Sequence, residues 1–223
     1  MDLYEAMRCA PTTRVFAPDP VPLQVVQRVL DNARFAPSGG NRQAWRVIAA
    51  TQPDTRRALR DLYLPSWRAY MQATGGAAAL ADPAGLGPRR VRMLRRADAF
   101  AEHLHEVPLH LVVCAALPAL AIVDAGLDRP SIVGGASIYP FVQNVLLGLR
   151  AEGLGAALTT LLAPAEPEVK ELLSIPEDVV LAAYVLVGRP GEAWPKRLSR
   201  EPVESFAFLE RYGEPLASGQ ASA

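Results

Sequence analysis

The chain has 223 residues, of which half are hydrophobic, and its 23 basic side chains match its 23 acidic ones. A chain of this length and apolar content can bury a sizeable core, so disorder is not expected for its bulk. The even charge balance provides no global field that would recruit nucleic acid or an anionic membrane. Cys9 and Cys114 lie far apart and fit a reducing compartment better than a disulfide framework. With no signal-peptide pattern in residues 1–20, we expect a cytoplasmic protein.

The first quarter of the chain predicts two helices, a strand and a third helix. Capping residues, helical spacing of apolar side chains and proline positions define these elements. We expect a short first helix capped by Asp2, an extended proline-rich piece over 16–22, a second helix that stops before Pro37, a strand over 45–51 and a helix over 53–64.

Residues 65–88 change character, because prolines, glycines and an alanine run leave no sustained period. Loops this long are uncommon inside a compact domain and often act as lids or binding segments. A disordered insertion is an equally good interpretation of the same composition. With the helix expected over 89–105, the segment 65–105 is predicted to be a lid or insertion.

The second half of the chain predicts a covered sheet. The almost wholly apolar run 179–187 indicates a central strand with both faces buried. Around it we expect strands over 109–117 and 155–162, a buried helix over 136–152, a short helix from Pro164, and a tail from about residue 189 with a short helix over 203–209. The alternation of helices and strands indicates an α/β or α+β class.

Several standard catalytic devices are missing. Gly153-Leu154-Gly155 is only a fragment of a dinucleotide-binding motif, and 135–139 lacks the closing glycine of a nucleophile elbow. His103, His105 and His110 do not form a ligand set, since an i,i+2 pair points to different faces of a helix, so no metal site is expected. If the chain is an enzyme, a cofactor is therefore expected to carry the difficult chemistry.

Three segments could bind an anion or the edge of a heteroaromatic ring. Thr12, Thr13 and Arg14 combine two hydroxyls with a guanidinium, which suits a phosphate. The basic run 196–200 could add positive charge to the same phosphate, and the segment 33–45 offers glycines with mixed donors and acceptors. Each also has an ordinary interpretation: a solvated turn, a solvated basic tail and a helix-to-strand loop, respectively.

Taken together and in order, these segments resemble the nitroreductase family of flavin enzymes. The matching stretches run from about residue 2 to residue 205. They are Thr12-Thr13-Arg14-Val15-Phe16, Pro20-Val21-Pro22, Ala33-Arg34-Phe35-Ala36-Pro37-Ser38-Gly39-Gly40-Asn41-Arg42-Gln43-Ala44-Trp45, Gln143-Asn144-Val145-Leu146-Leu147, Glu152-Gly153-Leu154-Gly155, Leu173-Ser174-Ile175-Pro176-Glu177-Asp178, Val187-Gly188-Arg189-Pro190 and Arg200-Glu201-Pro202-Val203-Glu204. No single piece is decisive, but the ordered set is specific.

The resemblance implies flavin mononucleotide (FMN) and an α+β fold. It implies a three-layer sandwich with a central, mostly antiparallel sheet flanked by helices. It further implies one domain over residues 1–223 and an obligate homodimer, with flavin sites at the interface and the C-terminal tail wrapped around the partner.

The resemblance also implies roles for particular residues. Thr12 and Arg14 would hold the phosphate from one end of the chain, with Arg200 and Arg197 from the other. Near the ring or ribityl chain it places Pro37, Ser38, Gly39, Asn41, Ser137, Tyr139, Leu158, Thr159 and Thr160, with Asn41 at the pyrimidine edge and 158–160 near N5.

This chain departs from the family pattern in three places. Ala10-Pro11 stand where the family often has two basic residues, so a phosphate contact is missing, and Arg8 is a possible substitute. Ala44 replaces the usual proline. For the basic residue that many members place near the pyrimidine carbonyl, Arg68 is only a weak match.

The function implied is a ping-pong transfer of hydride from NAD(P)H through FMN to an electron-poor acceptor, such as a nitroaromatic or a quinone. Tyr63, Trp67 and Tyr70 could line the acceptor pocket, although their i, i+4, i+7 spacing suits an ordinary core stripe somewhat better. The arginine-rich run 89–96 could receive a dinucleotide's phosphates, but acidic neighbours favour a solvated helix face. A flavin-storage protein, a reductive dehalogenase and an oxygen-dependent flavin-fragmenting enzyme are the alternatives on the same scaffold.

Overall fold

Four antiparallel strands form the centre of the molecule, in the order β1-β2-β4-β3. The computed structural model describes residues 1–195 and 198–216. β2 is buried along its whole length and β4 along its last six residues, which confirms the central strand predicted over 179–187. The strands are β1 (Trp45–Ala50), β2 (Leu109–Ala116), β3 (Gly155–Thr159) and β4 (Val179–Gly188).

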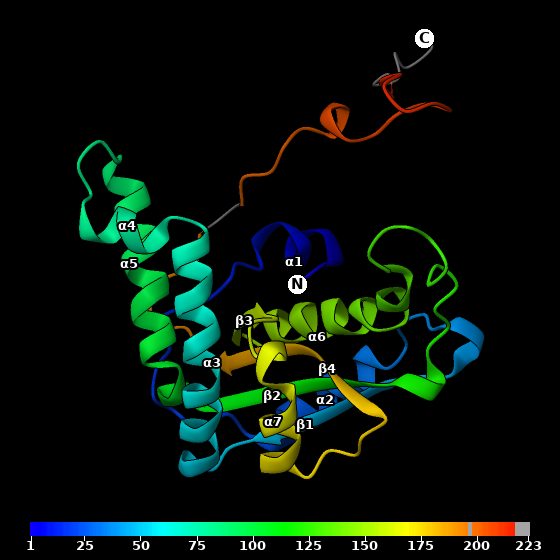
Figure 1. Ribbon diagram of the computed structural model, residues 1–223, viewed down its shortest axis with the longest axis horizontal. Coiled ribbons are helices and arrows are strands. Elements are labelled where there is room, and N and C mark those ends of the chain that lie inside the picture. Colours follow the sequence, from blue (N-terminus) through cyan, green and yellow to red (C-terminus); the bar gives the residue numbers. More distant parts are fainter. Residues whose placement is uncertain (196–197, 217–223) are drawn as a thin grey trace.

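Helices cover both faces of this sheet (Figure 1). Alternate residues of β2 point to opposite faces, so Leu111 and Val113 join one hydrophobic core whereas Val112 and Cys114 join the other. α2 (Leu23–Ala33) and α6 (Tyr139–Ala151) pack on the first face, while α3 (Pro53–Ala73) and α7 (Glu166–Leu173) pack on the second. The result is the three-layer α+β sandwich that the sequence predicted.

The segment expected to be a lid or a disordered insertion is helical. α3 continues through Pro65 to Ala73, so the helix end predicted near Leu64 is wrong. Pro65 lacks an N–H and faces solvent, and the buried stripe of Tyr63, Trp67 and Met71 holds the helix together on its other side. α4 (Gly76–Ala81) and α5 (Pro88–Glu102) then fold back along α3.

Shorter elements frame the sheet. α1 (Leu3–Cys9) begins at Asp2, whose Oδ1 accepts a hydrogen bond from Glu5 N at 3.0 Å, as the predicted cap requires. The helix predicted over 203–209 is a single 3₁₀ turn over Val203–Ser205, and β3 ends at Thr159 rather than at 162. Both cysteines are buried free thiols. Within the described ranges, no helix combines the length and apolar character needed to cross a membrane.

Candidate functional site

The N-terminal segment that carries Thr12 and Arg14 is attached to the edge of the sheet. Thr13 N donates to Ala156 O at 2.8 Å, and Thr12 forms a parallel bridge to the same residue of β3. Because side chains alternate along an extended chain, Thr12 and Arg14 project to one side and Thr13 to the other. Thr13 is 5% exposed and its Oγ1 accepts a hydrogen bond from Trp194 Nε1 at 3.2 Å. Thr13 thus fixes the segment, while Thr12 and Arg14 are left exposed.

A cavity of about 520 Å³ opens beside this segment. It lies between α3, α5 and the end of β3, and its volume falls within the range of small-molecule sites. Eight of the residues predicted to contact cofactor or acceptor line it: Thr12, Arg14, Tyr63, Trp67, Tyr70, Leu158, Thr159 and Thr160. The fold therefore brings together residues from three distant parts of the chain.

The aromatic residues of α3 belong both to the core and to the cavity wall. Tyr63 and Trp67 are nearly fully buried, whereas Tyr70 is half exposed. Trp67 Nε1 donates to Asp98 Oδ1 at 2.9 Å, which orients the indole ring. Burial raises the pKa of Tyr63, although Thr159 and Arg14 act in the opposite direction, so this phenol is protonated at neutral pH. The two interpretations of this stripe, core and pocket, are compatible.

The loop that leads into β1 forms a second group of predicted site residues. Gly39 N donates to Ser137 Oγ at 3.0 Å, and Gln43 N donates to Ser38 Oγ at the same distance. Asn41 and Gln43 have left-handed φ values of 53° and 49°. Such values are costly for residues other than glycine and concentrate at functional positions. The strained loop is therefore a candidate binding element in its own right.

One chain does not bring the two groups together. β1 and β3 are the two edge strands, separated by three interstrand spacings, or roughly 14 Å. Loop 37–41 enters β1, whereas Thr12 and Arg14 lie at β3. Tyr139, at the start of α6, is half exposed, and its hydroxyl donates to Ala182 O at 3.3 Å.

The predicted phosphate contact from Arg200 is not assembled within the described part of the chain. After Leu198, whose N–H donates to Arg8 O at 3.0 Å, the tail leaves the body of the molecule (Figure 1). Arg200 Nη1 donates to Ser199 O at 2.7 Å and is not among the residues that line the 520 Å³ cavity. Arg197 lies outside the described residues.

A larger cavity, of about 1140 Å³, is a groove between α1 and Trp194. It contains Arg8, the proposed substitute for the missing basic residues, but none of the residues predicted to bind flavin. Arg150 lies over the Trp194 ring at 3.9 Å from its centroid and donates to Cys9 O, so the groove is built mainly from structural contacts. The cavity beside Arg14 has the chemistry that a site requires, and we take it as the candidate site.

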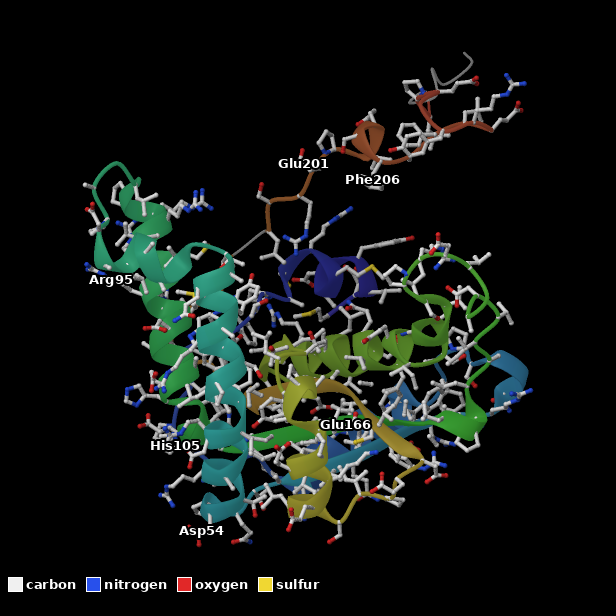
Figure 2. The ribbon with its side chains drawn as sticks, viewed as in Figure 1. Asp54, Arg95, His105, Glu166, Glu201 and Phe206 are labelled. Carbon is white, nitrogen blue, oxygen red and sulfur yellow. The ribbon has the colours of Figure 1, made fainter. Side chains whose placement is uncertain are left out.

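From the sequence, the region of α5 was expected to be part of a lid or a possible phosphate contact, and the wall that its apolar side chains contribute was not identified. Arg90, Met93, Leu94, Ala97 and Phe100 line the cavity at helical spacing. The helical spacing of these residues can be seen in the sequence. The helix against which they pack, the second half of α3, could not be identified, because α3 was expected to end near Leu64. Both α3 and α5 contribute side chains to the cavity lining, which does not include Arg95, a residue on the side of α5 away from α3 (Figure 2). Arg68, the weak match for a pyrimidine contact, is paired with Glu102 at 3.0 Å.

The cavity lining suits a flat aromatic ligand that carries an anionic group. Trp67 and Tyr70, with ring centroids 5.9 Å apart, provide aromatic surface, while Arg14 and the hydroxyls of Thr12 and Thr160 provide donors.

A metal site would need a cluster of His, Cys, Asp or Glu side chains as ligands. Over residues 1–195 and 198–216 no group of three or more His, Cys, Asp or Glu side chains is placed to hold a metal ion.

Comparisons with known proteins show the family to which this chain belongs. The model of the Nitroreductase family matches residues 11–189. The chain is 29% identical to a 5,6-dimethylbenzimidazole synthase from Rhodobacter capsulatus, covering 84% of this chain and 83% of that protein. It is 31% identical to an NADH dehydrogenase from Thermus thermophilus, covering 80% and 82%. A crystal structure of oxidized iodotyrosine deiodinase bound to FMN and 3-iodo-L-tyrosine superposes with a TM-score of 0.68 at 22% identity, covering 93% of this chain and all of that one.

Proposed function

Because this chain is an enzyme of the nitroreductase family, we propose that it binds FMN and passes hydride from NAD(P)H to an electron-poor acceptor. The observation that carries the proposal is the 520 Å³ cavity, where the Thr12 and Arg14 pair meets the end of β3 and the aromatic residues of α3. FMN, when bound, supplies the hydride-transfer chemistry that the side chains of this chain lack.

The proposed roles of the residues follow from their chemistry. Arg14 and Thr12 would hold the phosphate through charge-assisted hydrogen bonds, and Arg197 and Arg200 would add to this contact. The backbone of Leu158, Thr159 and Thr160 would lie near the reactive edge of the ring. Trp67 and Tyr70 would stack on the acceptor, and α5 would close the cavity and exclude water.

A homodimer would complete the site. Loop 37–41, whose Gly39 N donates to Ser137 Oγ, enters β1 at the opposite edge of the sheet from Arg14, so a second copy is the simplest source of these contacts. Two exposed apolar surfaces support this proposal. Leu3, Tyr4 and Met7 are exposed on α1, and Phe206, Leu209 and Tyr212 are exposed on the tail that leaves the body.

Anaerobic reduction tests the proposal directly. We expect the purified protein to be yellow, and NADH or NADPH to bleach it in the absence of air. A nitroaromatic or a quinone, added after the nicotinamide has been removed, should then reoxidise the protein and restore the yellow colour. A colourless protein that does not respond to added FMN would overturn the flavin assignment. A yellow protein that neither nicotinamide reduces would favour flavin storage.

Two further chemistries are favoured by the named relatives. The Rhodobacter relative is a 5,6-dimethylbenzimidazole synthase, and that product contains the dimethylbenzene ring of a flavin. The solved deiodinase structure contains 3-iodo-L-tyrosine. Reduced protein should therefore also be mixed with oxygen, or with iodotyrosine, and assayed for 5,6-dimethylbenzimidazole and for iodide. If 5,6-dimethylbenzimidazole or iodide forms faster than the nitroaromatic is reduced, that reaction replaces nitroaromatic reduction as the proposed activity.

A further inference from the structure

The arginine-rich face of α5 forms a second cavity that shares residues with the first. A space of about 250 Å³ is lined by Thr12, Arg14, Arg89, Arg92, Met93, Arg96 and Glu192. Thr12, Arg14 and Met93 also line the 520 Å³ cavity, so the two spaces meet at the N-terminal segment. Arg89, Arg92 and Arg96 recur at i, i+3 and i+7, which places them on one side of the helix.

This cavity has a strong excess of positive charge. Four arginines line it against one carboxylate, and that carboxylate, Glu192, is paired with Arg96. In the sequence, the acidic neighbours of this arginine-rich run favoured a solvated helix face over a phosphate site. In the structure those acids are engaged elsewhere, since Asp98 accepts from Trp67 Nε1 and Glu102 pairs with Arg68. Among the described residues, Arg14, Arg89 and Arg92 have no ion-pair partner.

Like charges at these spacings destabilise a helix unless a counter-charge accompanies them. A concave surface lined by one sign of charge concentrates ions of the opposite sign. Guanidinium groups match phosphate oxygens in geometry, and the Thr12 hydroxyl adds a neutral donor. The lining is therefore suited to a phosphate or diphosphate group.

We propose that Arg89 and Arg92 of α5, together with Thr12 and Arg14, form a phosphate-binding site. The site provides from a distant helix the positive charge that is absent at Ala10-Pro11, immediately before Thr12. The phosphate comes from FMN or from the nicotinamide co-substrate, and both sources share this chemistry. The identity of the ligand rests on the proposed function. The capacity of the cavity to bind an anion does not depend on it.

The test compares Arg89→Gln, Arg92→Gln and the double variant with wild type. Arg95→Gln is the matched control, because Arg95 is on the same helix but is not among the residues that line the two cavities. Affinities for FMN and for riboflavin, which lacks the phosphate, are measured by flavin fluorescence in the full chain. If FMN is the source, the double variant weakens FMN binding about tenfold or more and leaves riboflavin binding unchanged.

If the co-substrate is the source, flavin affinities stay unchanged. The KM for NADPH, or for both nicotinamides, then rises about tenfold in the double variant but not in Arg95→Gln. Unchanged FMN-to-riboflavin ratios together with unchanged nicotinamide KM values would overturn the proposal.

Pyrophosphate separates this proposal from the assignment of function. We expect millimolar pyrophosphate to raise the unfolding temperature of wild type and of Arg95→Gln, but not of the double variant. This result would support the anion site even if the wild type bound no flavin, an outcome that would overturn the proposed function alone. An equal shift in all variants would show that the arginines of α5 hold no phosphate.

Discussion

At the scale of single residues, one tightly held polar group is His110, the second residue of β2. It is fully buried, with Nε2 at 3.0 Å from Leu104 O and Nδ1 at 2.6 Å from the Tyr184 hydroxyl. A carbonyl can only accept, so Nε2 carries the hydrogen and Tyr184 donates to Nδ1. Burial lowers the pKa of His110 from 6.5 to about 3. This histidine is a neutral structural residue.

Acid should therefore destabilise the fold through His110. The unfolded chain takes up a proton on this residue below about pH 6.5, whereas the folded chain does not until about pH 3, so stability falls as the pH falls across that window. Between about pH 7 and about pH 5 the loss should be on the order of 2 kcal/mol, measured by urea unfolding. His110→Gln should lose less over the same interval. His103→Gln, at an exposed site, should behave as wild type. An equal acid loss in the His110 variant would contradict this account.

A second residue-scale feature is the contact between Gly155 and Thr13, which attaches the segment carrying Thr12 and Arg14 to β3. A Cβ on Gly155 would lie 2.6 Å from Thr13 Oγ1. Gly155→Ala should therefore displace the segment, destabilise the protein by about 1–3 kcal/mol and weaken FMN binding. Gly126→Ala is the control, because a Cβ there meets nothing within 4 Å. Thermal unfolding and flavin titration measure the two effects, and a Gly155→Ala protein with normal flavin affinity would show that the contact does not position Arg14.

At the scale of elements, α3 departs most from the sequence prediction. A proline within a helix normally ends it, and the amphipathic stripe of Leu59, Tyr63 and Trp67 overrides this tendency by burying one face against the sheet. The continuation carries Trp67, Tyr70 and Met71 to the cavity, so the correction to the fold also builds the site.

Replacing Pro65 should reveal the cost of that continuation. Pro65 is exposed, so Pro65→Ala removes little packing and restores one backbone donor within α3. We expect a gain in unfolding free energy of about 1–3 kcal/mol, from the helix propensity of alanine over proline. Gln72→Ala, at an exposed position of the same helix, should change stability by less than about 0.5 kcal/mol. A Pro65→Ala protein that is less stable than wild type would mean that proline itself is needed at this position of α3.

At the scale of the whole molecule, large apolar side chains on α1 and on residues 199–216 of the tail are exposed within the described part of the chain. Phe206 is 64% exposed and Tyr212 is 94% exposed, values more typical of an interface than of a free surface. Figure 2 shows Glu201 and Phe206 on this tail, away from the body of the molecule. A second copy would cover these side chains, and its loop 37–41 would complete the cavity beside Arg14 of the first copy.

Exchanging the apolar side chains of the tail tests the dimer. The double variant Phe206→Ser, Leu209→Ser should shift the sedimenting species from two chains towards one, because the burial of two large apolar side chains is lost. FMN content should fall in parallel if the partner completes the site. Glu201→Gln, a polar exchange on the same tail, should remain dimeric. A wild-type protein that sediments as a single chain at micromolar concentration, with bound flavin, would overturn the dimer proposal.

The sequence by itself determined the class of fold and most of the elements. The apolar run of β4 and the helical stripes of α2 and α6 are local patterns, and they predict buried strands and packed helices wherever they occur. Ordered motifs, from Thr12 to Glu204, were sufficient to indicate the family, since they depend on the residues and their order along the chain. The roles of Thr12 and Arg14 stay predictions, although both residues line the 520 Å³ cavity.

Tertiary structure decided which of these residues meet. It placed Arg14 beside Trp67 and the end of β3, kept loop 37–41 at the other edge of the sheet, and aligned Arg89 and Arg92 with Thr12. These contacts are long-range and depend on strand order and on the course of α3 past Pro65, neither of which has a local signature. The excess positive charge of the α5 surface depended on them too, because Asp98 and Glu102 of α5 contact Trp67 and Arg68 outside the arginine cluster.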